Sequence, residues 1–272
     1  MEKVIFFVDG FNFYHGLKKN IRIDSDWQQF YWIDFVKLFQ QFVGDNQSLE
    51  KVYYFTAPPP DADKFFRQRL LFKANSAINE DKFEVIDGKF FQKTIKCKIC
   101  GQNYRIHEEK HTDVNIAIKM LDDCILGNVD TIALVSADGD LLTPLKLINE
   151  RFPNVKIRVY FPPANKSDAL RNYMKTCKKQ VVHLAKNKFR FQKSVMPDYF
   201  PFLGNCVCYP IFRNSIRHNT FLKPEFIFGK MHDRFFAGFH IISQSIGFVC
   251  RWEIYSYFHA RITLVYEFQW SE

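Results

Sequence analysis

The fold is decided by the stretch Val4-Ile5-Phe6-Phe7-Val8, which leads directly into Asp9-Gly10 near the start of the 272-residue chain. An unbroken apolar run of this length is typical of a strand covered on both faces, as in a parallel sheet. Apolar-rich runs of similar length recur at 51–55, 131–135 and 156–161. Between the runs, apolar residues are spaced as on helices over 33–43, 61–78, 113–126 and 141–149. Alternating strands and helices predict an α/β sandwich whose central sheet is mostly parallel.

Acidic residues follow two of the predicted strands. Asp9 comes directly after the first run, and Asp138 and Asp140 follow the run 131–135. The carboxyl ends of parallel strands face the functional crevice of an open sheet, so these side chains are expected to converge there. Asp113 begins a predicted helix, and a residue in the first helical turn can reach the same crevice. The sequence therefore predicts a cluster of four carboxylates.

Such a cluster favours a bound cation, because neighbouring carboxylates repel one another and raise each other's pKa values. Oxygen ligands suit hard divalent cations, here Mg²⁺ or Mn²⁺. A cation of this kind would hold a phosphate oxygen and acidify a water, which equips the site to hydrolyse a phosphodiester bond. Each acid also has a structural interpretation: Asp9-Gly10 as a turn, Asp113 as a first-turn helix acid, and Asp138-Gly139-Asp140 as a loop and cap. Their shared placement at strand ends favours the site.

Three blocks carry a family resemblance. They are Val4-Ile5-Phe6-Phe7-Val8-Asp9-Gly10-Phe11-Asn12, Glu109-Lys110-His111-Thr112-Asp113-Val114-Asn115-Ile116-Ala117 and Val135-Ser136-Ala137-Asp138-Gly139-Asp140. In this order they resemble the signature of the NYN domain, and of its LabA-like subgroup in particular, within the PIN-like nuclease superfamily. The resemblance covers residues 1–185 and implies a PIN-like three-layer α/β/α sandwich with divalent-metal ribonuclease chemistry.

The resemblance also assigns roles to individual residues. It implies that Asp9, Asp113, Asp138 and Asp140 are the metal-binding and catalytic acids. Asn12 would position Asp9 or a ligand. Ser136 would orient the Asp138 loop or contact a phosphate.

Basic residues are concentrated in the same part of the chain. The formal net charge is +9, and residues 194–272 contribute only +1 of it. Arg67 on the predicted helix 61–78, Lys93, and Lys110 within the second block are candidates for contacts to RNA phosphates. Single-stranded RNA could also stack on exposed aromatic rings. The alternative interpretation is a solvated basic face.

Residues 83–108 are expected to form a local excursion. Asp87-Gly88 lies between two β-prone segments and predicts a two-residue hairpin turn. Cys97-Lys98-Ile99-Cys100-Gly101 then forms half of a zinc-knuckle pattern. Zn²⁺ takes four ligands, and His107 and His111 are the nearest further candidates. Plain reduced thiols, or ligands shared across a homodimer, are the alternatives.

A domain boundary is predicted near residue 190, giving a nuclease domain over 1–190. Residues 191–272 are aromatic-rich and lack helical stripes, so a small β-rich or irregular appendage is expected, with Lys193-Ser194-Val195-Met196-Pro197 as a continuation of the family pattern. The longest apolar stretch, 235–252, is interrupted by polar side chains, which argues against a membrane span. Seven cysteines without a secretory signal favour reduced thiols in the cytoplasm.

Rival functions leave different marks in the sequence. A phosphatase with an aspartyl nucleophile would carry a second acid two residues after Asp9, and Phe11 occupies that position. No glycine-rich dinucleotide motif follows the first strand. A non-catalytic RNA-binding or regulatory protein with the NYN fold remains as the alternative to a ribonuclease.

Overall fold

The computed structural model describes residues 1–197 and, beyond them, the strand residues 240–243, 248–251, 253–255 and 263–265. The chain divides into two compact units after Met196. In the second unit, β9 (His240–Ser243) pairs with β10 (Phe248–Arg251), and β11 (Glu253–Tyr255) pairs with β12 (Thr263–Val265), both in antiparallel fashion. Within the described residues, no helix combines the length and apolar character that crossing a bilayer requires.

The first unit is built on a six-stranded sheet in which every pair of neighbours is parallel. Its spatial order is β3 (Phe83–Asp87), β2 (Gln47–Thr56), β1 (Glu2–Asp9), β6 (Thr131–Val135), β7 (Lys156–Phe161) and β8 (Val182–His183). The strand β1 is therefore central, with its apolar residues Val4 to Val8 buried. This arrangement confirms the mostly parallel sheet predicted from the unbroken apolar runs.

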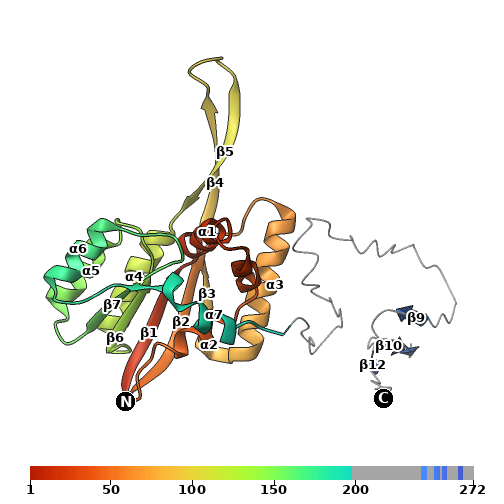
Figure 1. Ribbon diagram of the computed structural model, residues 1–272. Helices are drawn as coiled ribbons and strands as arrows, with labels where there is room; N and C mark the ends of the chain where they lie inside the picture. The colour runs from red at the N-terminus through yellow and green to blue at the C-terminus, as the bar shows by residue number, and fades with distance from the viewer. Residues whose placement is uncertain (198–239, 244–247, 252, 256–262, 266–272) are drawn as a thin grey trace. The chain divides into compact units, whose positions relative to one another are not determined.

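Helices cover both faces of the sheet, which confirms the three-layer α/β/α architecture (Figure 1). Val4, Phe6 and Val8 pack on one face, and Ile5 and Phe7 pack on the other. The first face carries α1 (Gly10–Ile21), the 3-10 helix η1 (Ser25–Tyr31), α2 (Phe35–Gln40), α3 (Ala62–Asn79) and α7 (Lys188–Lys193). The second face carries α4 (Thr112–Ile125), α5 (Leu142–Arg151) and α6 (Asp168–Thr176). Short 3-10 turns complete the unit at η2 (Glu80–Lys82) and η3 (Leu184–Asn187).

The predicted hairpin at Asp87-Gly88 is wrong. The segment before it, β3, adds to the sheet parallel to β2, and the Gly88 N–H donates to the Thr56 carbonyl across 2.6 Å. Because β3 finds its backbone partners on β2, the chain continues past Gly88 instead of turning back. The hairpin forms later, between β4 (Lys89–Lys96) and β5 (Asn103–Lys110).

This antiparallel pair, called the ribbon below, projects away from the sheet and helices of the first unit (Figure 1). Its turn spans Cys97 to Gln102 and contains Gly101 at a φ of +74°, a left-handed conformation that glycine adopts without a steric cost. The excursion predicted over 83–108 is therefore shifted: residues 83–87 belong to the sheet, and β4 and β5 form the projection.

The segment just after residue 190 belongs to the first unit. Ser194 and Met196 are buried, and the Ser194 carbonyl accepts from the Asp34 N–H at 2.9 Å. The Met196 N–H donates to the Trp32 carbonyl at 3.1 Å. Residues Lys193 to Met196 thus form the closing edge of the first unit.

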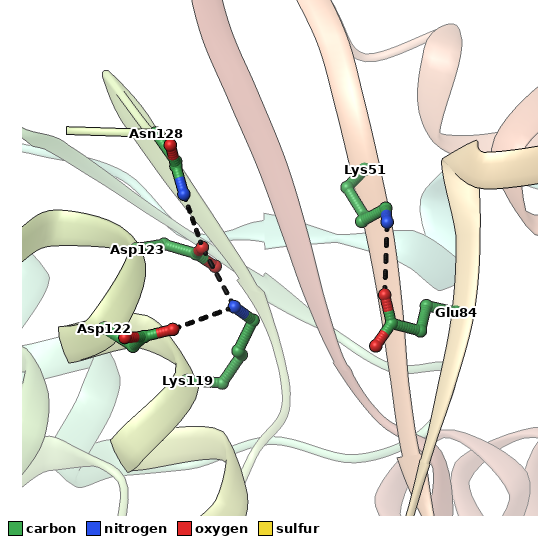
Figure 2. A network of polar contacts seen from close by, with 6 residues as sticks. All are labelled: Lys51, Glu84, Lys119, Asp122, Asp123 and Asn128. Carbon is green, nitrogen blue, oxygen red and sulfur yellow. Dashed lines mark hydrogen bonds and ion pairs between the residues drawn. The ribbon is translucent and has the colours of Figure 1, made fainter. Parts of the chain in front are cut away.

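A polar network holds α4 on its face of the sheet (Figure 2). Lys119 Nζ lies 3.1 Å from an oxygen of Asp122 and 3.1 Å from an oxygen of Asp123, which is only 1% exposed. Burial alone would lower the pKa of Lys119, but its hydrogen bonds to both carboxylates raise the pKa overall. The same amine lies 4.9 Å from the ring centre of Tyr53 on β2. The network fixes the helix whose first turn carries Asp113.

Candidate active site

The end of β1 sets the position of the first acid. Asp9 is the last residue of β1 and the N-cap of α1, where its Oδ1 accepts the Asn12 N–H at 2.9 Å. The side chain is nearly buried, at 4% exposure. Gly10 is required beside it, because a Cβ there would lie 2.3 Å from Cε1 of Tyr54 and 2.6 Å from the carbonyl oxygen of Phe55. The close approach of β1 to β2 therefore fixes the turn that aims Asp9.

Ser136 joins Asp9 to the neighbouring strand. Val8 and Val135 are register partners, so Ser136 follows β6 at the level where β1 ends. The Ser136 hydroxyl is completely buried and donates to Asp9 Oδ2 across 2.8 Å. The Ser136 hydroxyl oxygen in turn accepts the Asp138 N–H at 3.0 Å. Of the two roles expected for Ser136, the structure shows the orienting one.

The loop after β6 carries the next two acids. The Asp140 N–H donates to Asp138 Oδ1 at 2.9 Å, so the carboxylate of Asp138 shapes its own loop. Asp138 is half-buried, and Asp140 is exposed. A continuous chain of hydrogen bonds thus runs from Asp9 through Ser136 and Asp138 to the backbone of Asp140.

Asp113 enters this group from the opposite direction, in the first turn of α4. The pKa of its carboxyl is raised, first by partial burial and then by the negative charges of Asp138 and Asp140. That electrostatic effect places Asp113 in the field of the β6 loop. Asp9, Asp138 and Asp140 therefore lie at the carboxyl edge of β1 and β6, and Asp113 is near enough for the charges of Asp138 and Asp140 to act on it.

The acids do not form a closed ligand set in this structure. In the part of the chain that the structure describes, no three His, Cys, Asp or Glu side chains come together closely enough to hold a metal ion. The donor chemistry still fits a hard divalent cation, because Asp9, Asp113, Asp138 and Asp140 all offer carboxylate oxygens. Partial burial and the charges of Asp138 and Asp140 raise the pKa of Asp113, and a bound cation would relieve this repulsion.

Asn165 is a site residue that the sequence reasoning missed. It follows β7, the strand beside β6, and its Nδ2 donates to the backbone carbonyl of Asn12 at 2.9 Å and to Asn12 Oδ1 at 2.8 Å. Lys19 Nζ in turn donates to Asn165 Oδ1 at 3.0 Å. Asn12 therefore contacts Asp9 through its backbone N–H, while its side chain is held by Asn165. The strand-end rule that selected Asp9 would also have selected Asn165.

The predicted RNA-contacting residues lie on different elements. Arg67 is exposed on α3, and Lys93 is exposed on β4 of the ribbon. Lys110 is the last residue of β5, and its side chain lies outside the described residues. The base of the ribbon lies beside the start of α4, whose first turn carries Asp113, because the rings of Phe91 and His111 are 5.8 Å apart and His111 immediately precedes α4.

The ribbon register corrects the predicted zinc set. Cys97 and Cys100 lie at the tip, next to the Lys96–Asn103 pair, whereas His107 pairs with Gln92 four rungs lower. Four rungs separate backbone positions by about 13 Å, and His111 lies farther away at the base. Cys and His ligands reach a shared Zn²⁺ through bonds of about 2.0–2.3 Å, so one chain does not assemble these four ligands. The side chain of His107 itself lies outside the described residues.

The chain is similar to known proteins over part of its length. The chain is 25% identical over 195 residues to 6-hydroxy-3-succinoylpyridine 3-monooxygenase HspA of Pseudomonas putida (strain DSM 28022 / S16), covering 59% of this chain. It spans about 60% of the length of that relative. The crystal structure of a protein of unknown function from Vibrio parahaemolyticus RIMD 2210633 aligns with a TM-score of 0.45 and 20% identity, over 67% of this chain and 93% of that one.

The family assignment rests on a match to a family model. Residues 3–178 match the NYN domain, and this range spans β1 to α6 with all four acids and the ribbon. The matched range makes up more than half of the chain. The chain belongs to the NYN domain family, within the PIN-like nuclease superfamily.

Proposed function

We propose that the protein is a divalent-metal-dependent ribonuclease whose acids are Asp9, Asp113, Asp138 and Asp140. The observation that carries the proposal is the hydrogen bond from Ser136 to Asp9, because it ties acids from two strands into one constellation. The three sequence blocks support placement in the LabA-like subgroup. Free thiols at Cys97, Cys100, Cys124 and Cys177 fit a reducing compartment such as the cytoplasm.

The chain's own residues prepare the site for phosphodiester hydrolysis. Ser136 and the Asn12 N–H both donate to Asp9, and these two hydrogen bonds hold the nearly buried carboxylate at the edge. Asp113, Asp138 and Asp140 supply three further negative charges, two of them exposed to an incoming ligand. A bound Mg²⁺ or Mn²⁺ would supply the positive charge that draws the scissile phosphate to these acids and would acidify a water.

The ribbon supports single-stranded RNA as the substrate. Side chains alternate along a strand, so Lys89, Phe91 and Lys93 share a face with Tyr104 on the paired strand. These four side chains are exposed, Phe91 at 49% and Tyr104 at 50%. Exposed rings offer stacking surfaces to unpaired bases, and lysines offer contacts to phosphates. The face begins next to His111, two residues before Asp113, so an RNA strand bound along it would extend to the acids. Further proposed determinants of RNA placement are Arg67, Lys110, Asn12 and Ser136.

Cleavage of a fluorescently labelled, unstructured RNA with Mg²⁺ or Mn²⁺ tests the proposal. The wild-type chain is expected to cleave, Asp138→Asn is expected to lose cleavage, and EDTA is expected to abolish it. Asp122→Asn is the matched control, because Asp122 lies near the opposite end of α4 from Asp113. Equal cleavage by wild type and Asp138→Asn would show that the activity belongs to a contaminant. RNA binding without cleavage by the wild type would favour the alternative, a non-catalytic RNA-binding or regulatory NYN protein.

A further inference from the structure

The ribbon tip has the local geometry of a metal-binding knuckle. The Gly101 N–H donates to the Cys97 carbonyl at 2.9 Å, and the Cys97 N–H donates to the Gln102 carbonyl at 2.8 Å. These contacts fold the turn so that both cysteines belong to one tight loop.

The residues around Cys97 and Cys100 are exposed to solvent. The tip lies at the far end of the ribbon from the sheet (Figure 1), and Cys100 is exposed. Ile99, between the two cysteines, is 98% exposed, an unusual position for a large apolar side chain. Lys96 and Lys98 flank Cys97 and are also exposed. A surface that covered Ile99 would remove it from water and bring its own ligands to the thiols.

The first unit does not complete the ligand set. Within the described residues, no third His, Cys, Asp or Glu side chain joins the pair. Cys124 is buried near the end of α4, and Cys177 lies at the end of α6, both on the body of the unit. The ribbon register keeps His107 and His111 away. The pair is therefore half of a tetrahedral site, at the point of the unit that a second molecule can approach.

We infer that Cys97 and Cys100 form half of a Zn²⁺ site that the same pair of a second copy completes. One Zn²⁺ would then join two chains tip to tip through four thiolates, and the four thiol protons pass to solvent. The four thiolates leave a net charge of −2 around the ion, which Lys96 and Lys98 of both copies offset. The two Ile99 side chains cover each other at the junction. This site does not depend on the proposed ribonuclease activity.

The test uses the full chain, freed of metal and kept reduced with a phosphine, with Zn²⁺ then added. Metal content and molar mass are measured together, the mass by light scattering during size-exclusion chromatography. We expect one Zn²⁺ per two chains and a zinc-dependent doubling of the mass that EDTA reverses. Co²⁺ in place of Zn²⁺ should give the intense visible spectrum of a tetrahedral four-thiolate site. Cys97→Ser and Cys100→Ser should lose all three signals.

Two control variants separate this site from other thiols. Cys177→Ser should bind Zn²⁺ and dimerise like the wild type. A variant with Cys206, Cys208 and Cys250 of the second unit changed to Ser should do the same. One Zn²⁺ per monomer, retention of Zn²⁺ by Cys100→Ser, loss of Zn²⁺ in the second-unit variant, or no binding by the wild type would each overturn the inference.

Discussion

The hydroxyl of Ser136 donates to Oδ2 of Asp9 across 2.8 Å and thereby links the ends of β6 and β1, elements more than a hundred residues apart in the chain. Ser136→Ala removes a donor from a nearly buried carboxylate, so we expect a loss of about 1–3 kcal/mol in the free energy of unfolding. The displaced Asp9 should also lower the cleavage rate, by about 100-fold if its shift reaches about 1 Å.

Ser194→Ala is the matched control for this prediction, because Ser194 is also fully buried and hydrogen-bonded, but on the closing edge with Gln41 and the Arg190 carbonyl. It should lose stability without a change in the Mn²⁺ concentration that gives half-maximal cleavage. Ser136→Ala should raise that concentration. Equal metal dependence of the two variants would contradict a positioning role for Ser136.

Asp113→Asn should stabilise the metal-free protein while abolishing cleavage. The pKa of Asp113 is raised in the folded state by burial and by Asp138 and Asp140, so its ionised form costs stability. The cost is fully present above the folded pKa and disappears as the pH falls below the unfolded value of about 3.9. Because the residue is exposed, we expect a gain of about 0.5 kcal/mol, or roughly 1–2 °C in Tm, at neutral pH in EDTA. An unchanged or lower Tm at neutral pH would contradict the repulsion.

Glu2→Gln should destabilise the protein at neutral pH but not at strongly acidic pH. Glu2 accepts hydrogen bonds from Lys156 at 2.6 Å, from Gln47 at 2.7 Å and from the Thr131 hydroxyl, so it ties β1 to β2, β6 and β7. The Lys156 and Thr131 hydrogen bonds lower the pKa of Glu2 from 4.5 to about 2. Its stabilisation is therefore present above pH 4.5 and is lost as the pH falls from 4.5 towards 2. Because solvent screens this ion pair, we expect Glu2→Gln to lower the free energy of unfolding by about 1 kcal/mol at neutral pH. Urea unfolding at neutral pH and at strongly acidic pH measures the difference.

Lys119→Met should lower the free energy of unfolding strongly, because Asp123 is 1% exposed and would lose the cation that pairs with it. Removing one partner of a buried ion pair costs about 3–5 kcal/mol, since the remaining charge stays desolvated. Lys51→Met provides the comparison shown in Figure 2: Lys51 pairs with Glu84, which is 48% exposed, and should cost less than about 1 kcal/mol. Similar urea-unfolding losses for both variants would show that Lys119 does not neutralise Asp123.

The sequence predicted the sheet well because burial on both faces leaves an unmistakable pattern. The strand β1 and the run 131–135 are apolar without alternation, and the structure places them side by side. The helix α1 was not predicted, since Gly10 and Gly16 weaken its local helical signal. Gly16 is needed there because a Cβ would lie 2.3 Å from the Pro163 carbonyl oxygen. A contact with a loop so distant in sequence leaves no local trace.

The candidate site was also predicted only in part. The positions of the acids were predicted because strand ends and helix starts are visible along the chain: Asp9 ends β1, Asp138 and Asp140 follow β6, and Asp113 lies in the first turn of α4. Asn165 was missed because the strand-end argument selected carboxylates alone, and this residue is an amide four positions beyond the end of β7. Asp87-Gly88 was misassigned because its local turn signal competed with the parallel pairing of β3 to β2, which only the tertiary fold reveals.

The ribbon leaves the first unit at Lys89 and returns at Lys110, and these two residues are partners in the same ladder. Their Cα atoms are therefore only about 5 Å apart, a gap that a tight turn would close. Everything beyond that rung belongs to a ladder separate from the six-stranded sheet. A shorter or longer ribbon would therefore leave every backbone pairing of that sheet intact.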